Sequence, residues 1–114
     1  MNKYESLYCK MFVDIQCSRD ELIDKIIDFT GGKRELLRTI ITSFGEVDVI
    51  ENKAFYSDKK QHDNFLYYMY YLDIEPSIQS DEMEYIASIR KLLRQFKLQG
   101  TNVVAACDFE SELV

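Results

Sequence analysis

The chain has 114 residues, 46% of them hydrophobic, so it can form one core and we expect a single domain over residues 1–114. Twenty acidic and 14 basic residues give a net charge of −6, which disfavours the phosphate backbone of a nucleic acid and favours a basic partner. No apolar stretch near the N-terminus is long enough for a signal peptide or a membrane span, so we expect a cytoplasmic protein with no membrane partner.

The first two predicted elements are a strand and a helix. Residues 5–15 alternate between apolar and mixed positions, which is the period of a β-strand. Ser18 and Glu21 have the spacing of a capping box, so a helix should begin there and end at Gly31. The apolar face of this helix is expected to contain Leu22, Ile23, Ile26, Ile27 and Thr30.

The pattern from residue 33 onward is weaker. Leu36 and Leu37 could extend a helix, whereas the β-branched residues and the alternation that follow favour a second strand interrupted near Gly45. Whether residues 36–51 form one strand or two is left open.

Three further elements follow a polar connection at residues 52–64. Residues 65–75 form an almost unbroken apolar run, which predicts a third strand stopped by Pro76. Ser80 is expected to cap a long second helix. Residues 101–110 predict a last strand, too apolar for an edge exposed on both sides. The expected buried positions of the second helix are Tyr85, Ile86, Ile89, Leu92, Leu93 and Phe96.

This β-α-β-β-α-β order predicts an α+β, ferredoxin-like fold, an antiparallel sheet with two helices on one face and the other face open. On the first strand, Leu7, Cys9, Met11, Val13 and Ile15 should face the helices, and Tyr8 and Phe12 the open side. On the third strand, Leu66, Tyr68, Tyr70, Leu72 and Ile74 should face the helices, and Phe65, Tyr67, Met69 and Tyr71 the open side. Such an aromatic patch should be covered by a partner, a second copy or the chain's own loops.

The cysteines and the histidine do not form a metal-binding pattern. Cys9, Cys17 and Cys107 contain no CxxC pair, and His62 lies in a polar run far from all three. We therefore expect three reduced thiols, a solvated loop histidine, no metal and no cofactor.

Neither catalysis nor nucleic-acid binding has a motif in this chain. Carboxylates gather at the expected ends of the third and fourth strands, at Asp73, Glu75, Asp108, Glu110 and Glu112. They could form a Mg²⁺ site, but their spacing does not require one, and no phosphate-binding loop, HExxH or GxSxG is present. RRM domains stack RNA bases on the open face of this topology, but the RNP1 pattern is missing here. We expect a binding protein that is not an enzyme and does not bind nucleic acid.

The expected binding site combines aromatic anchors with an acidic rim that would steer a basic protein. It contains Tyr8, Phe12, Asp14, Tyr67, Met69, Tyr71, Asp73, Glu75, Asp108 and Glu110.

Three segments, LYCKMFVD (7–14), YYLDIEP (70–76) and VVAACDFE (103–110), resemble small bacterial immunity proteins of contact-dependent growth inhibition and related polymorphic toxin systems. The resemblance implies a cytoplasmic antidote that binds the C-terminal nuclease domain of a toxin and blocks its active site or substrate groove. The alternative is a dimeric ferredoxin-like module, paired through the open sheet face, with a small-ligand or catalytic site between its subunits.

Overall fold

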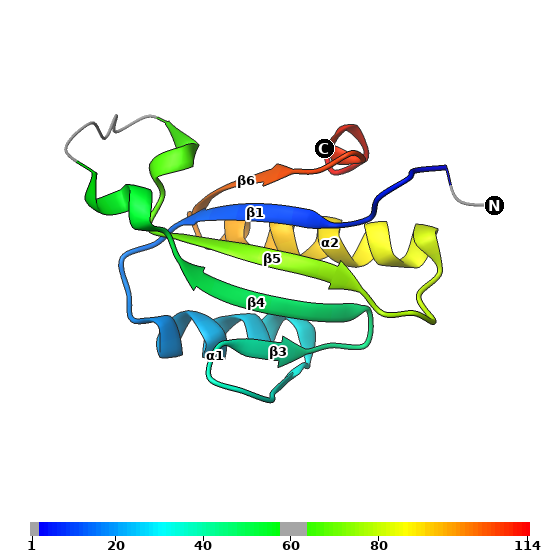
Figure 1. Ribbon diagram of the computed structural model, residues 1–114, viewed down its shortest axis with the longest axis horizontal. Coiled ribbons are helices and arrows are strands. Elements are labelled where there is room, and N and C mark those ends of the chain that lie inside the picture. The colour runs from blue at the N-terminus through cyan, green and yellow to red at the C-terminus, as the bar shows by residue number, and fades with distance from the viewer. Residues whose placement is uncertain (1–2, 58–63) are drawn as a thin grey trace.

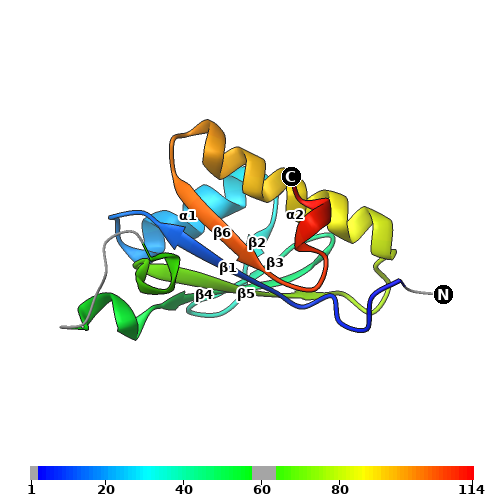
Figure 2. The ribbon, with the colours of Figure 1, turned by 90° about the horizontal axis from the view of Figure 1, so that it is seen from above.

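The computed structural model describes residues 3–57 and 64–114, and His62 lies outside this range. The chain has an α+β fold in which two helices, α1 (Arg19–Thr30) and α2 (Glu82–Leu98), pack on one face of an antiparallel sheet (Figures 1 and 2). The described residues form six strands, which are β1 (Cys9–Asp14), β2 (Lys33–Arg34), β3 (Thr39–Ile41), β4 (Gly45–Glu51), β5 (Tyr70–Pro76) and β6 (Asn102–Ala106). No helix in this part of the chain is long and apolar enough to cross a bilayer.

The strands pair in the order β2-β3-β4-β5-β1-β6, and every neighbouring pair is antiparallel. The expected ferredoxin-like order is therefore not confirmed, because β2 and β3 extend the sheet beyond β4. Residues 36–51 contain two strands, β3 and β4, and not one interrupted strand. They are separated by a tight turn in which the Thr42 hydroxyl accepts a hydrogen bond from the Gly45 amide at 3.0 Å. Glycine is required at position 45 because a Cβ there would lie 2.0 Å from the Glu75 carbonyl oxygen.

The capping residues of α1 agree with the sequence prediction, whereas the N-cap of α2 does not. The Glu21 amide donates to the Ser18 hydroxyl at 3.1 Å, and Gly31 has a φ of 71°, so α1 begins and ends as predicted. The cap of α2 is Asp81 and not Ser80, because the Ser80 hydroxyl donates instead to the Phe44 carbonyl at 2.8 Å. The Ser80–Phe44 hydrogen bond thus links the β5–α2 connection to the turn before β4.

The prediction of a strand over residues 65–69 is wrong. Phe65–Tyr67 form a 3₁₀ turn, η2, and a second one, η1, covers Lys53–Tyr56. Leu66 and Tyr68, expected to face the helices, are 50% exposed and half-buried respectively. The physical reason is Asn52, whose buried amide donates to the carbonyls of Leu66 at 2.9 Å and Tyr68 at 2.7 Å and satisfies groups that a strand would pair.

The last strand is shorter than predicted. It ends at Ala106, and the chain then turns into a 3₁₀ segment, η3 (Glu110–Glu112). Phe109 is fully buried and its ring lies 5.9 Å from that of Tyr85, so burial of this aromatic ring accompanies the turn away from the sheet.

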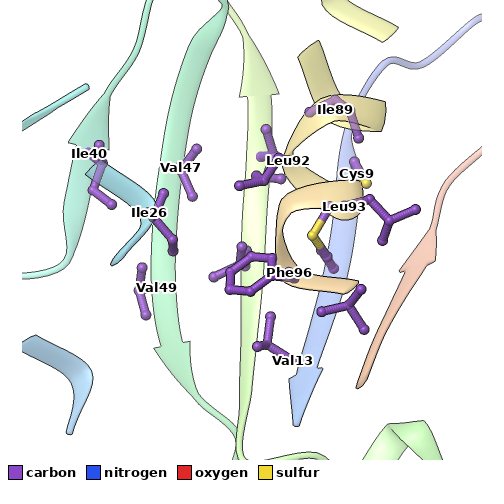
Figure 3. Packing of buried hydrophobic residues seen from close by; sticks show 14 of the residues in the cluster. Cys9, Val13, Ile26, Ile40, Val47, Val49, Ile89, Leu92, Leu93 and Phe96 are labelled. Carbon is purple, nitrogen blue, oxygen red and sulfur yellow. The ribbon is translucent and has the colours of Figure 1, made fainter. Parts of the chain in front are cut away.

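The core lies between the sheet and the two helices, where Figure 3 shows Ile26, Leu92 and Phe96 among strand residues. The first-strand prediction is confirmed for Cys9, Met11 and Val13, which are fully buried. The six positions predicted for the second helix are all buried; on α1, Ile27 and Thr30 are only half-buried. The two stripes of helical side chains therefore bury one face of the sheet and leave the other face without a helix.

Candidate partner-binding face

The sheet face opposite α1 and α2, called here the open face, presents its side chains in rows across the strands. The strand register places Val104, Phe12, Tyr71 and Ile50 in one row, from β6 to β4. A second row runs parallel to it and contains Ala106, Lys10, Asp73, Asp48 and Thr39. An apolar row thus lies directly beside a charged one.

The apolar row is partly covered by the chain itself. Phe12 is only 5% exposed, because the Phe65 ring of η2 packs edge-on against it at 5.2 Å and the Tyr71 ring lies at 5.9 Å. The aromatic patch was expected to be covered by a partner, a second copy or the chain's own loops, and the connection that contains η2 covers part of it. Tyr71 and Ile50 stay half-exposed and extend the apolar surface toward β4.

Lys10 links the charged row to the apolar row, and Tyr8 adds a hydrogen bond to the charged row. The Lys10 ammonium lies 4.1 Å from the centroid of the Tyr71 ring and 5.2 Å from that of Phe12, within cation–π range. The Tyr8 hydroxyl donates to a carboxylate oxygen of Asp73. Burial and this hydrogen bond both raise the pKa of Tyr8 above its ordinary value, so the phenol stays a donor into alkaline solution.

Four carboxylates on β4 and β5 form what we call the acidic patch. Asp48 lies directly opposite Asp73, and Glu46 directly opposite Glu75. The Thr39 hydroxyl donates to Asp48 at 2.7 Å, but the two glutamates are exposed and belong to neither of the ion pairs within residues 3–57 and 64–114, which are Lys3–Glu112 and Arg34–Asp20. Like charges directly opposite each other destabilise a strand pair. Asp73 also has Lys10 opposite it on β1 and accepts a hydrogen bond from Tyr8, so the repulsion falls mainly on the exposed Glu46–Glu75 pair.

The structure brings only part of the expected binding site together. Tyr8, Phe12, Tyr71, Asp73 and Glu75 share the open face around the two rows. Asp14 lies on the same face at the far end of β1, opposite Asn102.

The other four expected residues lie apart from these two rows. Tyr67 belongs to η2, and Met69 precedes β5 and packs against the core. Asp108 is exposed in the turn after β6, and Glu110 lines a groove with Leu93 of α2. The carboxylates that follow β6 therefore do not join Asp73 and Glu75 in one site.

Sequence reasoning missed Lys10, Glu46, Asp48 and Ile50. The alternation of Glu46, Asp48 and Ile50 with Val47 and Val49 was the available signal, but their neighbours across the sheet depend on a register that alternation does not give.

The cysteines lie away from the acidic patch and are thiols. Cys9 and Cys107 lie one step beyond the Lys10–Ala106 pair of strands β1 and β6, and their thiols share a hydrogen bond. That bond, with burial, raises the pKa of Cys9, and the same bond lowers the pKa of Cys107. Among the described residues, no group of three or more His, Cys, Asp and Glu side chains is placed to hold a metal ion.

No family model, curated protein or solved structure matches this chain.

Proposed function

We propose that the protein binds a basic protein partner through the open face and acts as an immunity protein that neutralises a toxin nuclease domain in the cytoplasm. The observation that carries this proposal is the acidic patch. It contains two directly opposed carboxylate pairs, Asp48 with Asp73 and Glu46 with Glu75, and the exposed Glu46–Glu75 pair destabilises the folded protein. A partner that places Lys or Arg side chains between the carboxylates would convert this repulsion into attraction.

The apolar row supplies the other half of such an interface. Tyr71 is half-exposed between the acidic patch and Phe12, so a partner attracted by the carboxylates would meet a large, rigid ring at the centre of the contact. Aromatic anchors of this kind contribute most of the affinity in protein interfaces, whereas exposed charges mainly raise the association rate. The acidic surface also supports a protein partner over a nucleic acid, because phosphates would be repelled.

We also propose that β4, β5, β1 and β6 form a ferredoxin-like unit with α1 and α2, to which β2 and β3 are added. The pairing order β4-β5-β1-β6 and the helix on each crossover support this interpretation. The unit would leave the face opposite the helices available for the partner.

A growth-protection assay tests the function. Cells that express the nuclease domain of a toxin encoded beside this protein should grow when the protein is co-expressed. A Glu46→Lys, Glu75→Lys double variant should lose protection, because it reverses the exposed half of the acidic patch.

The matched control is Asp24→Lys, Asp28→Lys, which makes the same change in net charge on the exposed side of α1. This control should still protect. Loss of protection in the control alone would place the partner on the helices and contradict the proposal, as would full protection by the sheet variant.

A further inference from the structure

The two edges of the sheet differ in how they are protected against pairing with another chain. The β2 edge is only two residues long and charged, and Arg34 forms an ion pair with Asp20 at 2.8 Å. The β6 edge is five residues long, NVVAA, with neither a charge nor a proline. Short length and charge are the usual means of blunting an edge strand, so β6 is the edge that stays open to a further strand.

A groove runs beside the β6 edge on the helix side of the sheet. It measures about 420 Å³ and lies between α2, β6 and the C-terminal segment. Its apolar wall includes Leu93, Leu113 and Val114, and Val114 is fully exposed. Figure 2 looks at the molecule from this edge and shows β6 beside α2 and the C-terminus. The unpaired strand and an apolar hollow therefore form one continuous surface.

We propose that a second copy of this chain pairs with β6, so that two six-stranded sheets join edge to edge in a two-fold dimer. The register that uses all five residues is antiparallel and centred on Val104, with Asn102 opposite Ala106 of the second copy. In this register the apolar row of the open face continues across the joint, because Val104 is its outermost member. The dimer would carry two open faces on the same side of one long sheet.

The charges around β6 match this two-fold arrangement. Lys97 lies near the C-terminus of α2, close in sequence to the start of β6, whereas Asp108 and Glu110 follow the end of the strand. Lys97 and Glu110 both line the groove, and within residues 3–57 and 64–114 neither belongs to an ion pair. Antiparallel pairing brings the start of one β6 to the end of the other. Lys97 of each copy then lies beside Glu110 of the other copy, which gives two equivalent contacts. Parallel pairing would place Lys97 against Lys97.

The test measures the mass of the purified chain by analytical ultracentrifugation over a concentration series. The wild type should form a dimer. Lys97→Glu and Glu110→Lys should each raise the dimer dissociation constant about tenfold, because each turns two attractive contacts into repulsive ones. The double variant should recover the wild-type value, and this recovery distinguishes a direct charge contact from a general effect on folding.

Val104→Lys supplies an independent arm, because it places two lysines opposite each other at the two-fold axis and should abolish the dimer. Val104→Thr is the matched control, since threonine is β-branched and neutral and should keep the dimer. Circular dichroism verifies that each variant is folded. A wild type that stays monomeric, charge variants that dimerise normally, or a dimer lost in Tyr71→Ala but kept in Val104→Lys would each overturn the proposal.

Discussion

Replacing Glu46 with lysine should make the protein more stable, although the side chain is exposed and the change removes no hydrogen bond given by the structure. Glu46 lies directly opposite Glu75 on the open face. The substitution removes one repulsive cross-strand pair and creates an attractive one, and an opposite-charge pair contributes about 0.2 to 1 kcal/mol. We therefore expect the free energy of unfolding to rise by about 1 kcal/mol, which for a domain of this size raises the Tm by about 4 °C.

Urea denaturation at low and high salt is the assay. The gain should shrink at 1 M salt, where the Debye length falls to about 3 Å. The matched control is Asp14→Lys, because Asp14 is also exposed on the open face but lies opposite the neutral Asn102. It makes the same change in net charge and should give a smaller gain. Equal gains for the two variants, or a gain for Glu46→Lys that salt does not reduce, would refute the argument from cross-strand repulsion.

Three further predictions concern the scaffold. Ile89→Ala should cost about 2 to 5 kcal/mol in a denaturant melt, because the side chain is fully buried between α2 and the sheet, and a loss under half a kcal/mol would mean that the core is misassigned. Asn52→Ala should cost about 1 to 3 kcal/mol, because it removes the hydrogen bonds that the buried Asn52 amide donates to the carbonyls of Leu66 and Tyr68, and an unchanged melt would contradict this role. Alanine at each cysteine in turn should leave partner binding intact in a folded protein, and stoichiometric zinc by elemental analysis, or lost binding in a folded Cys107→Ala variant, would contradict this expectation.

The helices and the core could be predicted from the sequence because their signals are local. The capping box at Ser18, the left-handed Gly31 and the apolar spacing of α2 each lie within a few residues of the feature that they determine. The alternation of apolar residues along residues 5–15 is also a local signal, and it correctly predicted that Cys9 and Met11 lie on the buried side of β1.

The failures have a different origin, because they depend on contacts between distant residues. Asn52 satisfies carbonyls 14 and 16 positions later and so prevents a strand where the apolar run predicts one. Half of the acidic patch escaped prediction for a similar reason, since Glu46 and Asp48 lie opposite Glu75 and Asp73 only through the β4–β5 register. Glu110 was misplaced because β6 ends four residues earlier than its apolar pattern suggests.

The most direct test of partner binding by the open face is surface plasmon resonance against the toxin nuclease domain. Tyr71→Ala should weaken binding about thirtyfold, the equivalent of about 2 kcal/mol at a central aromatic anchor. Glu46→Lys, Glu75→Lys should mainly slow association, and rising salt should slow association of the wild type more than it speeds dissociation. Asp24→Lys, Asp28→Lys should bind with nearly wild-type kinetics. Unchanged kinetics for Tyr71→Ala together with slowed association for the α1 variant would contradict the account and place the partner on the helices.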